Sequence, residues 1–76
     1  MYDYDKLYGK IREVFKTQEA FAEAMDMSRS ALNLRLNGKV SWKAEEITMA
    51  CELLGIPMSE AHLYFFELKV VKTLLC

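Results

Sequence analysis

The stretch TQEAFAEAMDMSRSALNLRLNG, residues 17–38, decides the fold of this 76-residue chain. It contains two short runs of helix-favouring residues, 18–25 and 29–36. Thr17 and Ser28 stand directly before these runs, and both residue types favour the N-cap position of a helix. Only two or three residues separate the two predicted helices, so they must cross at a large angle. That arrangement is the geometry of a helix-turn-helix.

The second of these helices has one face for the core and another for a ligand. Leu32 and Leu36 lie at i and i+4, so they share the face that packs inward. The opposite face carries four candidate base-contacting residues, namely Arg29, Ser30, Asn33 and Leu34. Arginine suits guanine edges, asparagine suits adenine edges, serine suits either, and an apolar carbon suits the thymine methyl group. The helix is therefore equipped to read the major groove of double-stranded DNA.

The charge of the chain is unevenly distributed. The formal net charge is only −1, from ten basic and eleven acidic residues. Between Ser28 and Lys43, however, there are four basic residues and no acid: Arg29, Arg35, Lys39 and Lys43. The other segments hold six basic and eleven acidic residues. A local positive surface is enough for phosphate contact, so the small total charge does not exclude nucleic acid.

The flanking segments are predicted to be helical as well. A first helix starts at Asp3 as N-cap, with apolar residues at steps of three and four. Those residues are Tyr4, Leu7, Tyr8, Ile11, Val14 and Phe15. Gly9 lies inside this helix, and close packing by a neighbour would explain it. Ser41 is the predicted N-cap of a further helix, and Ser59 of one or two last turns. The inward residues of the helix after Ser41 are Ile47, Ala50, Cys51 and Leu54.

The C-terminal segment, residues 64–76, has a different pattern. Its residues mostly alternate with a period of two, which is typical of extended structure, although the same residues could prolong a helix. Its apolar side chains are too many for a small core. Either part of it folds back onto the helices, or a second subunit covers it. We favour dimerisation through four residues: Tyr64, Phe66, Leu68 and Val70.

Several classes of protein are excluded by composition and spacing. No apolar run reaches the roughly 18–20 residues that span a membrane. Cys51 and Cys76 form no disulfide framework, and no secretory signal precedes the chain, so a reducing cytoplasm is expected. His62 is the sole histidine, and no metal-binding spacing is present. We expect no metal, no cofactor, no small-molecule substrate and no catalytic activity.

The central stretch resembles the Cro/CI-type, lambda-repressor-like helix-turn-helix repressors of phages and prophages. The two ends extend the resemblance, through Tyr2-Asp3-Tyr4 and Tyr64-Phe65-Phe66. It implies a compact bundle of about five helices that binds an operator as a dimer. It also implies that Gln18 contacts phosphate and braces the recognition helix. The chain departs from the family at Asp26, where glycine is usual, but Asp tolerates the left-handed conformation better than most residues.

Further site residues follow from this resemblance and from the basic segment. In the family, the first residues of the recognition helix read bases, which carries over to Arg29, Ser30 and Asn33, and the Asn that follows it touches phosphate. The candidate phosphate-contacting residues are Thr17, Gln18, Arg35, Asn37, Lys39 and Lys43. Arg35 shares a helical side with Leu32, so a partner within the chain is an alternative for it.

The sequence thus predicts a single all-α domain over residues 1–76, with four or five helices and a helix-turn-helix over 17–37. A short extended segment at the C-terminus is included in this prediction. The predicted function is that of a cytoplasmic, dimeric, sequence-specific transcriptional regulator that binds a double-stranded DNA operator. The alternative is a helical protein-interaction module, such as an antirepressor or an antitoxin-like partner, that does not bind DNA.

Overall fold

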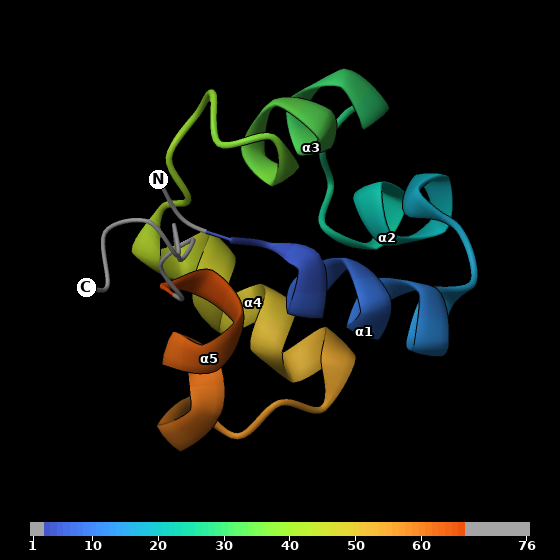
Figure 1. Cartoon of the computed structure of the whole chain (residues 1–76). Helices are drawn as coiled ribbons and strands as arrows, with labels where there is room; N and C mark the ends of the chain where they lie inside the picture. The colour runs from blue at the N-terminus through green and yellow to red at the C-terminus, as the bar shows by residue number, and fades with distance from the viewer. Residues whose placement is uncertain (1–2, 67–76) are drawn as a thin grey trace.

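The fold is all-α, as predicted. The computed structural model describes residues 3–66, and within them it contains five α-helices and no strand (Figure 1). The helices are α1 (Asp5–Phe15), α2 (Gln18–Ala24), α3 (Arg29–Leu36), α4 (Ala44–Leu54) and α5 (Ala61–Phe65), with a 3₁₀ turn at Met58–Glu60. Over this range, no helix has the length and apolar character needed to cross a bilayer.

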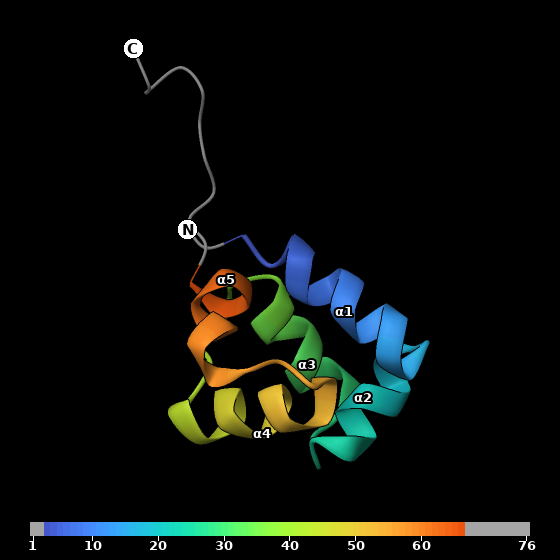
Figure 2. The same cartoon turned by 90° about the horizontal axis from the view of Figure 1, so that it is seen from below.

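The helices gather around one apolar core (Figures 1 and 2). Helix α1 packs against α2, α4 and α5, and α2 packs against α3. The largest fully buried side chains are Phe21, Phe65, Leu7, Ile11, Leu32 and Cys51. The predicted inward faces of α3 and α4 are buried, which confirms the helical periodicity that assigned them. The core therefore fixes which face of α3 is left for solvent.

The N-caps of α2 and α3 are those expected from the sequence. The Thr17 hydroxyl accepts a hydrogen bond from the Ala20 backbone N–H at 3.1 Å. The Ser28 hydroxyl accepts one from the Ala31 backbone N–H at 3.0 Å. Each bond satisfies a backbone donor that has no partner within the helix. These two short helices are thus set by local chemistry at their first turns.

The turn between α2 and α3 depends on a left-handed aspartate. Asp26 has φ 59°, as its position in place of the usual glycine predicted. The N–H of Asp26 donates to the Glu23 carbonyl at 3.0 Å, and the N–H of Met27 donates to the Ala22 carbonyl at 3.0 Å. This pair of bonds is a Schellman motif, which ends α2 and turns the chain towards α3.

The prediction for α1 is wrong in three details. The helix begins at Asp5, and Asp3 lies outside it, although its carboxylate accepts a hydrogen bond from the Asp5 N–H at 2.9 Å. Tyr8 and Val14 are 40% and 42% exposed, so the buried stripe is narrower than predicted. A Cβ at Gly9 would meet nothing within 4 Å, so no neighbour explains that glycine.

Ser41 and Ser59 are not the N-caps that the sequence suggested. Helix α4 begins at Ala44, and the backbone N–H of Lys43 donates to the Glu46 carboxylate at 2.9 Å. Glu46 is the third helical residue, and its side chain reaches back to the backbone of the N-cap residue, as the Glu of a capping box does. Ser59 lies inside the 3₁₀ turn that precedes α5.

The extended interpretation is wrong for the start of the C-terminal segment. Tyr64 and Phe65 belong to α5. Phe65 is 1% exposed, and its ring meets that of Trp42 edge to face, with centroids 5.1 Å apart. Burial of this ring outweighs the local alternation, because tertiary packing readily overrides β-propensity. The predictions for Leu68, Val70 and the other residues after 66 lie outside the described residues.

The hydroxyl of Ser28 should contribute measurably to stability. We expect Ser28→Ala to lower the free energy of unfolding by about 1 kcal/mol, because the Ala31 N–H loses its acceptor. Urea denaturation at neutral pH measures this loss. Ser30→Ala is the matched control, since Ser30 is an exposed serine in the first turn of the same helix. Equal losses in the two variants would contradict the capping role.

Candidate functional site

The exposed face of α3 is the centre of the candidate site. All four predicted base-contacting residues are exposed: Arg29, Ser30, Asn33 and Leu34. Leu34 is 42% exposed, much as the apolar side chains of Tyr8 and Val14 are on α1. Leu32 and Leu36, on the opposite side of the helix, are 0% and 7% exposed. The division of α3 into a packed face and an accessible face is therefore as the sequence predicted.

Arg29 is held in place by two residues of α2. Its Nε donates to the Gln18 side-chain oxygen at 3.0 Å, and its Nη1 lies 2.8 Å from a Glu19 carboxylate oxygen. Gln18 is 7% exposed, so it is a fixed partner. The predicted brace between the start of α2 and α3 is present, and Arg29 is the residue that it braces.

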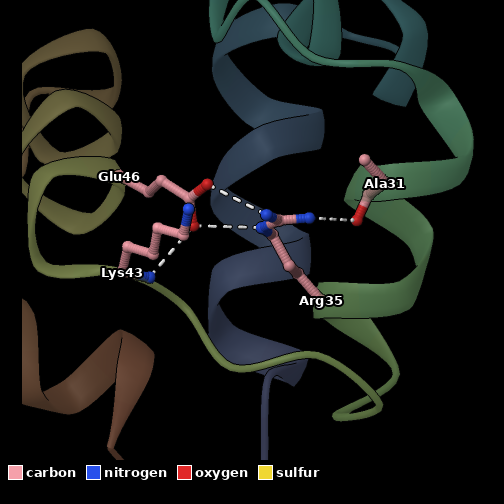
Figure 3. Close-up of polar contacts among 4 residues, drawn as sticks. All are labelled: Ala31, Arg35, Lys43 and Glu46. Carbon is pink, nitrogen blue, oxygen red and sulfur yellow. Dashed lines mark hydrogen bonds and ion pairs between the residues drawn. The ribbon is translucent and has the colours of Figure 1, made fainter.

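Arg35 makes contacts inside the molecule (Figure 3). Its Nε and Nη2 each donate to one carboxylate oxygen of Glu46 at 3.0 Å, and its Nη1 donates to the Ala31 carbonyl at 3.0 Å. The side chains of Arg35 and Glu46 are only 13% and 18% exposed. Of the two roles left open for Arg35, the structure shows the intramolecular one. Its predicted phosphate contact has no support in this arrangement.

The Arg35–Glu46 pair has an electrostatic signature. The hydrogen bonds from Arg35 lower the pKa of the Glu46 carboxyl below its ordinary value, and they outweigh partial burial, which acts in the opposite direction. The backbone N–H of Lys43 adds to the lowering. Glu46 is therefore held as a carboxylate that links α3 to the start of α4.

The surface around the basic segment carries less positive charge than the sequence of residues 28–43 indicates. Glu19 and Glu46 lie outside the acid-free interval 28–43, but they are the ion-pair partners of Arg29 and Arg35. Two of the four cations are thus paired with acids from neighbouring helices. Lys39 and Lys43 are the exposed basic residues between α3 and α4.

Two cations at the end of α1 were not identified from the sequence. Arg12 and Lys16 line the same shallow hollow as Thr17, Gln18 and Arg29. Both are exposed, and they stand beside the N-terminus of α2. Arg12 lies in the last turn of α1 and Lys16 is the C-cap residue, so both are on the side of the molecule where α1 ends, and their sequence spacing of four was the available signal. What the sequence did not show is that this side meets the start of α2.

The remaining phosphate candidates lie around the two ends of the α2–α3 pair. Thr17 is exposed at the start of α2, where its hydroxyl already caps the helix. Asn37 is the exposed C-cap of α3, and Lys39 and Lys43 follow in the connection to α4. These positions flank the face of α3 on both sides. Contact with DNA remains a prediction for each of them.

An apolar groove lies near the end of α5. It is lined by Tyr4, Gly38, Val40, Ser41, Trp42, Phe65 and Phe66, and its volume is about 460 Å³. Phe66 is 50% exposed and Tyr64 is partly buried against the core. These are the two predicted dimerisation residues that the structure describes. Their placement at one end of the molecule leaves the face of α3 accessible.

The comparisons with known proteins define a family and one close structural relative. A family described as "Protein of unknown function (DUF739)" matches residues 1–68, so this chain belongs to that family. The chain is also similar to the solution structure of the modulator of repression (MOR) of the temperate bacteriophage TP901-1 from Lactococcus lactis. The two chains are 44% identical with a TM-score of 0.77, over 92% of this chain and 95% of that chain. The comparison with curated proteins gave no match.

Proposed function

We propose that this chain is a helix-turn-helix regulator of phage gene expression that binds operator DNA through α3. The observation that carries the proposal is the exposed polar face of α3, with Arg29 braced by Gln18. Arg29 and Asn33 are the two side chains best suited to bidentate contacts with guanine and adenine. Similarity to a phage modulator of repression supports a role in regulating transcription.

In the proposed complex, α3 lies in the major groove and the flanking residues contact phosphates. Arg12, Lys16 and the N-terminus of α2 stand on one side of α3. Lys39 and Lys43 stand on the other side. A recognition helix between two phosphate-binding flanks is the usual arrangement of helix-turn-helix proteins on DNA. This role is one of binding and needs no catalytic group.

We further propose that the active form is a homodimer in the cytoplasm of the host. A two-fold dimer places two recognition helices in successive major grooves, one helical turn apart. Tyr64 and Phe66, at the end of α5, are the described residues assigned to the interface. Sedimentation of the full chain with and without operator tests this assignment. Phe66→Ser should shift the equilibrium towards monomers.

Salt dependence is the most direct test of DNA binding. Selection from a random duplex pool should recover a palindromic site. The affinity for this site should fall about 10³-fold or more between 50 and 200 mM salt, as for proteins with six or more phosphate contacts. Fluorescence anisotropy with a labelled duplex measures the decrease. Weak binding that is independent of salt would contradict the proposal.

A protein partner is the second candidate, and the ion pairs of the site favour it. Glu19 and Glu46 pair with two of the four basic residues between Ser28 and Lys43, and Leu34 adds an exposed apolar residue to the face of α3. A surface of mixed charge around an apolar residue is typical of a protein interface. Because the similar protein is a modulator of repression, we propose a phage repressor as this partner. Titration with that repressor, without DNA, separates the two candidates, because only a protein-binding module forms a complex in that mixture.

A further inference from the structure

We propose that Glu19 is an internal competitor for Arg29, which the ligand of α3 must displace. This inference rests on the proposed function of α3 and adds a device that sets its affinity and its specificity. It starts from the observation that Arg29 has two partners of different character. One is a neutral, buried amide, and the other is a charged, exposed carboxylate.

The two partners of Arg29 have separable roles. Gln18 is 7% exposed and holds Nε at 3.0 Å, so it orients the guanidinium without changing its charge. Glu19 has a side chain that is 68% exposed and holds Nη1 at 2.8 Å. Because Glu19 is exposed and holds Nη1, an anion or base edge that binds Nη1 must take its place. Gln18 can stay in place when a ligand binds, whereas Glu19 must move aside.

The competition discriminates between ligands. A single phosphate oxygen exchanges one charged contact for another, so it gains little and meets repulsion from the released carboxylate. A guanine edge offers two acceptors to the guanidinium in a fixed geometry and, because it is neutral, is not repelled by the released carboxylate. The side chain of Arg29 is 47% exposed, so it can reach such an edge without unpacking. Glu19 therefore suppresses non-specific binding more strongly than operator binding.

The test compares two variants of the full chain that lose the same charge from the same helix. Glu19→Gln removes the competitor, and Glu23→Gln removes an exposed carboxylate one turn further along α2. We expect Glu19→Gln to bind non-specific duplex DNA about 1.5-fold to fivefold more tightly, the usual range for an exposed ion pair. Its plot of log affinity against log salt should be steeper by about 0.9. Glu23→Gln should change both quantities much less.

Two outcomes overturn the inference. Equal gains in Glu19→Gln and Glu23→Gln would show a general effect of net charge. A gain from Glu19→Gln that persists when Arg29 is also replaced by alanine would show that Arg29 is not the group released. In the expected case, the gain disappears in the Arg29→Ala background.

A second probe separates the failure of this inference from the failure of DNA binding. Inorganic pyrophosphate is titrated into the full chain while the Nε–Hε signal of Arg29 is followed by NMR. We expect Glu19→Gln to bind this anion about 1.5-fold to fivefold more tightly than the unmodified chain does. That result supports the competition even if no duplex binds. Equal affinities for pyrophosphate overturn it, whatever the result with DNA.

Discussion

Replacement of both Arg29 and Asn33 by alanine is expected to weaken binding to the selected operator by at least about thirtyfold. Each good bidentate contact with a base contributes about 1–3 kcal/mol of discrimination, and 1.4 kcal/mol corresponds to tenfold. Affinity for a scrambled duplex should fall much less, because Lys39, Lys43 and the other flanking cations remain. The measured quantity is therefore the ratio of the two affinities.

The matched control for this double variant is Lys6→Ala. Lys6 is an exposed cation in the first turn of α1, away from the assigned contacts. It should leave the ratio of affinities unchanged. Circular dichroism should show that both variants keep their helices, since Arg29 and Asn33 are exposed. An unchanged preference for the operator in the double variant would refute base reading by α3. Loss of repressor binding instead would favour the protein partner.

The α2–α3 pair was predictable because its determinants are local. Thr17 and Ser28 each satisfy a backbone N–H three residues further on. Asp26 adopts the left-handed conformation that ends a short helix. Caps and turns depend on a few consecutive residues, so a single sequence contains the information. The exposed face of α3 then follows from helical periodicity, given Leu32 and Leu36 in the core.

The charge of the site was not predictable in the same way. Arg35 and Glu46 are eleven residues apart, and they meet only because α3 and the start of α4 are packed side by side. The pairing of Arg29 with Glu19 likewise needs the turn between two helices. A count of charges along the chain gave four basic residues and no acid between Ser28 and Lys43, whereas the structure pairs two of the four with acids from outside that interval. Long-range ion pairs are a property of the tertiary fold.

The environments of three apolar residues also could not be predicted from the local pattern. These residues are Tyr8, Val14 and Phe65. Periodicity predicts which side of α1 is apolar, but the neighbours of that helix decide how wide a stripe they cover. At Phe65 the alternating pattern favours a strand, while contact with Trp42 stabilises a helical turn. In a chain this small, one buried aromatic ring outweighs several local preferences.

Replacement of Arg35 by methionine is expected to lower the free energy of unfolding at neutral pH by about 2–3 kcal/mol. Removal of one partner from a fully buried ion pair costs roughly 3–5 kcal/mol. The expected loss here is smaller, because Arg35 and Glu46 keep some contact with solvent. Arg35 lowers the pKa of Glu46 in the folded state. The resulting stability is fully present above the ordinary carboxyl pKa and is lost as the pH falls through the lowered value.

The difference between the unmodified chain and Arg35→Met should therefore shrink as the pH falls below the range in which Glu46 titrates. At low pH the carboxyl is protonated in both proteins, and the unpaired charge that destabilises the variant is gone. Urea denaturation at several pH values measures this difference. Glu45→Gln is the control, because Glu45 is exposed in the same turn of α4 and should stay within about 0.5 kcal/mol of the unmodified chain. A difference that stays constant with pH would mean that Arg35 stabilises by packing alone.

The Arg35–Glu46 pair links α3 to α4, so it can also affect how α3 is oriented. Loss of operator affinity in Arg35→Met, under conditions where the variant remains folded, would show that this link orients α3 for binding.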